Sequence, residues 1–209
     1  MENLKRINVN NLKKLYMKQI IIILIITFSI YSCKAQMISI EEANTYFLNE
    51  DQGIPDNVTS IKDINNKLDE FLGSWMVNYD NKNYQFMISK FESTLVDIPH
   101  DILLIRYIIS DENNNVLEDT SNLSNDNILV INGNYFLNDS ESYLLSYYSS
   151  NFNCGQFGDI TLDVDNNSLG GNEMKFYFIP GTKMINVNEC TEPLTFPFPT
   201  DTFLTFTKQ

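Results

Sequence analysis

The spacing of apolar residues changes along this chain, from a helical period in its first part to alternation in the rest. Apolar positions three and four residues apart follow the capping pattern SIEE and predict a short helix over roughly 40–48. A second stripe of the same kind predicts a helix over 61–72 that ends at Gly73. From Ser74 onward the period becomes two, which is typical of half-buried β-strands. The pattern therefore predicts one or two short helices followed by strands.

The strand-like segments are short and separated by turn residues. The turn DNKN joins the first two into a hairpin, whereas Asn132 and Gly133 form either a second hairpin turn or a glycine bulge in one longer strand. The series predicts eight or nine strands and hence a barrel or sandwich. The segments are 74–79, 84–89, 102–110, 128–131, 134–137, 142–149, 159–165, 174–179 and 200–208.

An apolar run near the N-terminus, from Ile20 to Tyr31, is too short to span a bilayer, which takes roughly 20 residues in a helix. It fits the core of an export signal, with Lys18 before it and a small residue, Ser32, after it. We expect residues 1–32 to act as this signal. Translation is then expected to start at Met17, or the preceding basic leader is removed with the signal.

Cys33 follows this run directly. Ile30, Tyr31, Ser32 and Cys33 resemble the end of a bacterial lipoprotein signal, in which the cysteine receives lipid. The resemblance implies a protein attached by a lipidated Cys33 to the outer membrane of a bacterial cell envelope, on either face. Two or more acyl chains would hold it there stably. The alternative is ordinary secretion with a cut after Ala35, which would discard the cysteine.

Removal of residues 1–32 leaves 9 basic and 26 acidic residues, a formal charge of −17. We expect a lipid-anchored segment and connector over 33–60 and one barrel domain over 61–209. So negative a chain repels phosphate, which argues against nucleic acid as a partner. Cys154 and Cys190 are expected to form a disulfide in an oxidising compartment, with two buried free thiols as the alternative.

The stretch FLGSW, residues 71–75, connects a short helix to the first strand. This Gly-x-Trp start followed by antiparallel hairpins resembles the lipocalin-like barrels, in which the tryptophan plugs one end. The resemblance implies an up-and-down antiparallel barrel of about eight strands with Trp75 at its end. The mature chain as a whole resembles a family of small envelope lipoproteins whose lipocalin-like domain has no assigned function.

Catalytic motifs are absent from the sequence. His100, in the loop IPHD, is its single histidine and is expected to be exposed, and there is no HExxH, GxSxG or phosphate-binding glycine loop. We expect a non-enzymatic protein without cofactor or metal. Arg106 is the one charge in an apolar strand. It is expected to face outward or to stack on an aromatic ring, with an anchor for an anionic head group at the barrel mouth as the functional alternative.

Two functions remain open from the sequence. The first is binding of a small apolar or amphipathic ligand in the barrel, and a solidly packed interior would argue against it. The second is docking onto another envelope protein, which an exposed apolar patch away from the mouth would favour. A carboxylate-driven hydrolase is a third reading, and it would need a buried acid pair facing a cleft.

Overall fold

The computed structural model of the chain describes residues 16–20, 36–49, 53–94, 98–137, 141–164, 172–183, 190 and 194–209. The chain divides into two compact units, Met1–Ala35 and Gln36–Gln209. In the first unit residues 16–20 are helical, and the rest of the predicted signal, as well as Cys33 after it, lies outside the described residues. Within the described ranges, no helix is both long and apolar enough to cross a bilayer.

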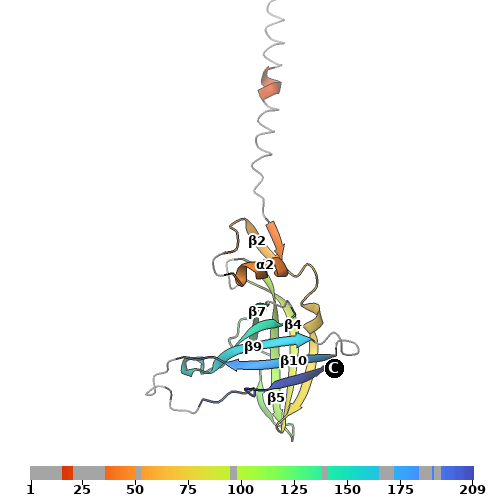
Figure 1. Cartoon of the computed structure of the whole chain (residues 1–209), viewed down its shortest axis with the longest axis vertical. Helices are drawn as coiled ribbons and strands as arrows, with labels where there is room; N and C mark the ends of the chain where they lie inside the picture. The colour runs from red at the N-terminus through yellow and green to blue at the C-terminus, as the bar shows by residue number, and fades with distance from the viewer. Residues whose placement is uncertain are drawn as a thin grey trace, which may run out of the picture. The chain divides into compact units, whose positions relative to one another are not determined.

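The second unit consists mostly of β-strands (Figure 1). Its elements in chain order are β1 (Gln36–Ser39), α2 (Ile40–Phe47), β2 (Val58–Lys62), the 3₁₀ turn η1 (Asp69–Phe71), β3 (Gly73–Tyr79), β4 (Lys82–Ser93), β5 (His100–Asp111), β6 (Val116–Asp119), β7 (Ile131–Phe136), β8 (Tyr143–Tyr148), the 3₁₀ turn η2 (Phe152–Cys154), β9 (Phe157–Val164), β10 (Glu173–Pro180) and β11 (Phe203–Lys208).

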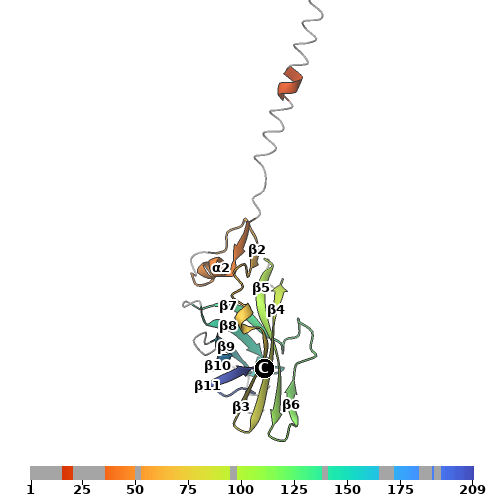
Figure 2. The same cartoon turned by 90° about the vertical axis from the view of Figure 1, so that its right-hand side faces the viewer.

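Eight of these strands close into an antiparallel barrel (Figure 2). Their order around the barrel is β3, β4, β5, β7, β8, β9, β10 and β11, and β11 pairs back onto β3. The seam between β5 and β7 is short, with Leu104 opposite Asn132 and Ile105 opposite Ile131. Successive strands of the chain are neighbours, so the predicted up-and-down antiparallel barrel of about eight strands is confirmed.

The two ends of the barrel differ. At the closed end, where β3 begins, Trp75 is fully buried and its indole Nε1 donates a 2.8 Å hydrogen bond to the carbonyl oxygen of Phe71 in η1. The Nζ atom of Lys208, near the end of β11, lies 5.0 Å from the centre of the tryptophan ring, within cation–π range. The opposite end carries the β3–β4, β5–β6 and β8–β9 connections and is called the mouth below.

The first predicted helix is confirmed as α2. Ser39 caps it by accepting a 3.1 Å hydrogen bond from the backbone N–H of Glu42, and Glu41 and Glu42 lie near the positive end of the helix dipole. Ile40 and Ala43 face the core. The helix and the parallel pair β1–β2 lie beyond the closed end, since Ile61 of β2 pairs with His100, the first residue of β5.

The second predicted helix, over 61–72, is wrong. Ile61 belongs to β2, and the following chain turns around the buried carboxylate of Asp63. That carboxylate accepts hydrogen bonds from the backbone N–H groups of Lys67 (2.7 Å) and Leu68 (3.1 Å) and from Lys90 Nζ (3.0 Å). A buried aspartate that satisfies these donors holds the chain in a turn, which overrides the helical spacing of the apolar residues.

Asn132 and Gly133 do not form a hairpin turn: β7 carries a bulge at Gly133 and Asn134, so the second of the two predictions is confirmed. The β7–β8 register shifts between Gly133 and Tyr135. A side chain at Gly133 would stand 2.6 Å from a ring carbon of Tyr143 and 2.9 Å from the backbone nitrogen of Leu103. Glycine is needed here because three strands approach closely at the β5–β7 seam. The short strand β6, which pairs with β5 on the mouth side of this seam, was not predicted.

Candidate functional site

Aromatic side chains fill the inside of the barrel. Inward-facing rings from the strands are buried to within 2% exposure and contact one another in stacked and edge-on pairs, for example Phe86 with Phe206 at 4.3 Å and Phe86 with Phe176 at 5.4 Å between ring centres. A small barrel of eight strands is just wide enough for side chains to fill it. This packing argues against an apolar ligand in the interior.

One ring of this core comes from outside the strands. Residues 194–200, here called the plug segment, belong to the long connection between β10 and β11 and have no regular secondary structure. Phe198 is 2% exposed, and its ring centre lies within 5.2–6.4 Å of six others. The six are Tyr84, Phe86, Tyr107, Tyr147, Phe176 and Phe178. Phe198 therefore closes the barrel on the mouth side.

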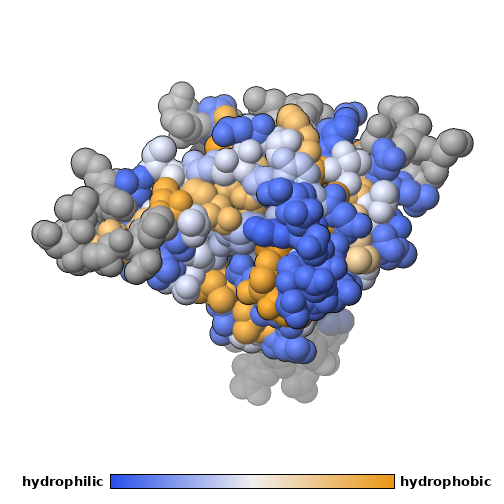
Figure 3. All heavy atoms as spheres, turned by 90° about the horizontal axis from the view of Figure 1, so that it is seen from below, coloured by the Kyte–Doolittle hydropathy of each residue, from blue (hydrophilic) through white to orange (hydrophobic). Residues whose placement is uncertain are grey.

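A cavity of about 540 Å³ lies above this plug. The plug segment forms one wall, and the others come from the β3–β4 turn, from β6, from the loop before β7 and from the β8–β9 connection. The lining residues are Lys82, Glu118, Leu129, Tyr147, Ser149, Ser150, Gln156, Thr195, Phe196 and Pro197. Its volume is in the range of small-molecule sites, and it combines polar groups with a few apolar surfaces. Figure 3 shows the molecule from this end, with apolar side chains (orange) among hydrophilic ones (blue).

A hydrogen-bonded chain of polar groups crosses the floor of the cavity. Tyr107 donates from its hydroxyl to Glu118 Oε1 at 2.5 Å and also shares a hydrogen bond with the phenol of Tyr147. Ser149 contacts the Tyr147 phenol in turn and donates to Gln156 Oε1 at 2.8 Å. These bonds link β5, β6, β8 and the β8–β9 connection, so the side chains hold each other in place without a ligand.

Burial keeps the phenols of this region neutral. Removal from water, reinforced by the Glu118 carboxylate, raises the pKa of Tyr107 and of Tyr147 well above the usual tyrosine value. Burial, with a smaller contribution from Asp80, raises the pKa of Tyr84 to about 12. These phenols are therefore protonated at neutral pH and can donate hydrogen bonds.

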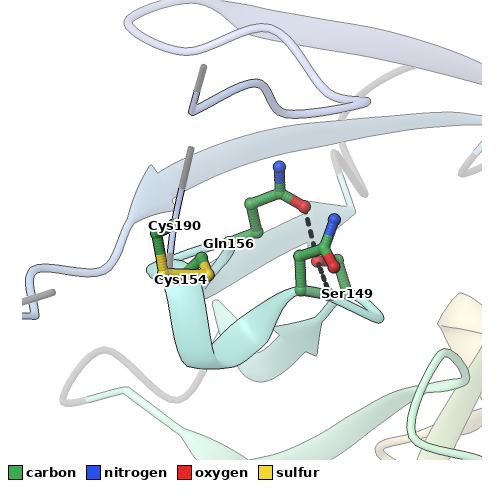
Figure 4. Close-up of a disulfide and its surroundings, with 5 residues drawn as sticks. Ser149, Cys154, Gln156 and Cys190 are labelled. Carbon is green, nitrogen blue, oxygen red and sulfur yellow. Dashed lines mark hydrogen bonds between the residues drawn. A yellow bond between two sulfur atoms is a disulfide. The ribbon is translucent and has the colours of Figure 1, made fainter. Parts of the chain in front are cut away.

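A disulfide ties the plug-bearing connection to the rim of the mouth. Cys154 in η2 and Cys190 are joined, with their Cα atoms 5.5 Å apart. Figure 4 shows this bond beside Gln156, whose side chain reaches to Ser149. The bond therefore fixes the connection that carries the plug segment next to the β8–β9 wall of the cavity.

The other candidate site residues predicted from the sequence, Trp75, Arg106 and His100, do not line the mouth cavity. Trp75 lies at the closed end, away from the cavity. Arg106 points outward from β5, where its Nε donates a 2.9 Å hydrogen bond to the carbonyl oxygen of Leu123 and its guanidinium also contacts Asn125. It is not among the residues that line the mouth. The expectation of an exposed His100 is wrong: it is half-buried at the start of β5, and burial lowers its pKa.

A second cavity, of about 320 Å³, lies at the closed end. Its lining comes from α2, from the start of β5 and from β7, and includes Phe47, His100, Ile102 and Tyr135. The rings of Phe47 and Tyr135 stack across it at 5.9 Å. It occupies the gap where β5 and β7 diverge beyond their short seam, so the splayed strands account for it.

Sequence reasoning missed the mouth. Lys82 and Glu118 look like ordinary hairpin charges, and only pairing of β6 with β5 brings Glu118 inside. The plug had a usable signal in LTFPFPT, because phenylalanines between prolines cannot form a regular strand and still need burial.

One family model matches residues 17–209 of the chain, and its description is a family of unknown function (DUF6705). The match includes the apolar run and Cys33 together with the entire barrel. No curated protein and no solved structure matches the chain. The chain therefore belongs to DUF6705, a family of unknown function.

Proposed function

We propose that this protein is a lipid-anchored, non-enzymatic barrel of the bacterial cell envelope that binds one small amphipathic molecule at its mouth. The observation that supports a ligand is the 540 Å³ cavity, in which fixed hydrogen-bonding groups face the apolar surface of the plug segment. Its volume falls in the range of small-molecule sites, and its lining is more polar than that of most of them. The proposal moves the ligand from the packed interior to the mouth.

The lipocalin-like character of the barrel is part of the proposal. The support is the Gly-x-Trp start of β3 and the burial of Trp75 between η1 and Lys208 at the closed end. In lipocalins an arginine from a late strand packs on this tryptophan, and here Lys208 of β11 lies over the ring. A binding role without catalysis is supported by the separation between this cavity and the single histidine, His100, which lies at the other end of the barrel.

The anchor is supported by the lipoprotein-like residues 30–33, which lie in the matched family region. The intact mass of the protein purified from its own host tests it. A chain that begins at Cys33 and carries acyl groups is the expected result. A Cys33→Ser variant is then expected to leave the detergent phase on partition. A mature chain that begins at Gln36 without lipid would refute the anchor.

The ligand is tested by native mass spectrometry of the protein extracted gently from the same envelope. We expect a bound small molecule that is lost on unfolding and in a Gln156→Ala, Ser149→Ala double variant. Wild-type protein that arrives empty from several growth conditions would contradict the binding role.

A second function, docking onto an envelope protein, is favoured by one feature of the outer surface. Phe203 is 65% exposed and stacks on Tyr177 at 4.6 Å, and Ile179 beside them is 47% exposed. These side chains form an apolar strip on β10 and β11, away from the cavity lining. A protein subunit retained in the native mass spectrum, and lost in a Phe203→Ser variant, would support this function.

A further inference from the structure

The mouth cavity carries two opposite charges on separate walls. Lys82 lies at the start of β4 and Glu118 in β6, and both line the cavity. In the barrel register, Lys82 is opposite Asp111 of β5, while Glu118 is opposite Ile109 of β5. Side chains two residues apart on a strand share a face, so both charges lie on the inward side with the buried Tyr84 and Ile109.

Neither charge is neutralised by an ion pair within the part of the chain that the structure describes. Its ion pairs join Lys62 with Glu92 and Asp101, and Lys90 with Asp63 and Asp69. Asp111, the nearest acid to Lys82 in the register, instead accepts hydrogen bonds from its own turn, from the backbone N–H groups of Asn113 and Asn115 and from the Asn115 amide.

The same register limits how far apart the two charges are. Lys82 and Glu118 are two strand spacings and two residues apart, which places their backbones about 12 Å from each other. Both residues line the same cavity, so one ligand in it can contact both side chains. The Lys82 nitrogen and the Glu118 carboxylate oxygens are more than 4.0 Å apart, the limit for an ion pair. A ligand that contacts both side chains must therefore carry two charged groups of opposite sign. The distance between those two groups must be roughly one to three residues of extended chain, at about 3.5 Å each.

We infer that the mouth binds a short peptide with free ends, in which the ammonium group meets Glu118 and the carboxylate meets Lys82. This inference rests on the proposed function and names its ligand class. Hydroxyl and amide groups of Ser149, Thr195 and Gln156 match the peptide groups between the two ends, because each can donate or accept. Leu129 and Phe196 offer apolar contact to the peptide side chains.

Other ligand charges fit less well. A purely anionic molecule would be repelled by Glu118 and by the formal charge of −13 on the protein. A purely cationic molecule would be repelled by Lys82. A neutral polyol would bring no charge opposite to that of Lys82 or of Glu118, so neither charge would gain a counter-ion. A dipolar ligand satisfies both at once.

The test is calorimetric titration of the intact mature domain with the dipeptide Ala-Phe and with its N-acetyl and C-amide derivatives. We expect Ala-Phe to bind, and either modification to weaken binding by about tenfold or more, the range for a lost hydrogen bond between charged groups. Glu118→Gln keeps an acceptor for Tyr107, so the domain should fold. In it, acetylation should have no further effect, whereas amidation should. Lys82→Met should show the reverse.

The outcomes distinguish failure of the peptide inference from failure of the proposed small-molecule binding role. Equal binding of Ala-Phe and its two derivatives would overturn the dipolar ligand. If no peptide binds but the native mass spectrum still shows a retained small molecule, the peptide inference is refuted and the proposed binding role is retained. An empty protein that also binds no peptide would remove both. Thr205→Ala, on the outward face of β11, is the control and should bind Ala-Phe as wild type does.

Discussion

Truncating the plug tests whether Phe198 belongs to the core of the barrel. Its side chain is 2% exposed, so Phe198→Ala loses about 1.5–3 kcal/mol of hydrophobic burial. A hole of roughly 100 Å³ would add about 2.4 kcal/mol if the core does not relax. We expect a loss of about 4 kcal/mol, which for a domain of this size lowers Tm by about 10 °C.

The fluorescence of Trp75, the single tryptophan of the chain, reports urea unfolding from the buried closed end. Leu194→Ala is the matched control in the same segment, since Leu194 is 52% exposed, and it should cost less than about 0.5 kcal/mol. Benzene should raise the Tm of Phe198→Ala and leave wild type unchanged, because apolar cavities stay dry and accept such molecules. Equal stability of the two variants would refute a plug in the core.

Three further results follow from the structure. Replacing both cysteines of the Cys154–Cys190 disulfide, which closes a loop with a sequence separation of 36, should lower the free energy of unfolding by about 4 kcal/mol in urea titration; an unchanged midpoint would contradict this. Gly133→Ala should cost about 1–3 kcal/mol, since the new Cβ would stand 2.6 Å from a tyrosine ring carbon of β8, whereas Gly53→Ala, with nothing within 4 Å, should cost almost nothing. Tyr84 has its pKa raised to about 12 in the folded protein against about 10 when unfolded, so its contribution to stability is complete below pH 10 and is lost between about pH 10 and 12; unfolding followed against pH should show a smaller slope there for Tyr84→Phe.

The barrel could be predicted because its strands obey local rules. Alternation of apolar residues in β3, β4, β9 and β11 needs only one buried face, and the turns between them carry residues that favour tight connections. The bulge at Gly133 remained undecided, because a hairpin and a bulge use the same pair of residues. The close approach of Tyr143 and Leu103, which is a tertiary contact, decides it.

The helix predicted over 61–72 shows where local rules stop. Ile61, Leu68 and Phe71 of its apolar stripe are buried, but they belong to β2, to a turn and to η1, and Ile64 of the same stripe is 55% exposed. The residue that decides the outcome is Asp63, which looks like a surface charge in the sequence. Lys90 lies 27 positions away in the chain and 3.0 Å from it in the fold. Pairings over such distances in sequence cannot be read from spacing.

The mouth could not be predicted for the same reason. Its lining comes from five separate parts of the chain, and no two of its charges share a motif. Glu118 faces inward because β6 pairs with β5, and within the described residues Lys82 forms no ion pair, while Asp111 opposite it bonds to its own turn. The sequence shows which polar residues are present, but the pairing of the strands determines which of them face each other.

The two ends of the barrel suggest how the proposed anchor and the proposed site would work together. β1 begins at Gln36, beyond the closed end, because its partner β2 meets β5 at His100. Cys33 precedes Gln36 by three residues, which reach at most about 11 Å. A lipid on Cys33 would therefore hold the closed end near the bilayer and leave the mouth on the side away from it. A site in that position takes its ligand from water, which suits a charged, water-soluble peptide and not a lipid. Peptide affinity that is the same for the soluble Cys33→Ser protein and for the lipidated protein on vesicles would support this arrangement, whereas loss of binding on vesicles would place the mouth against the membrane.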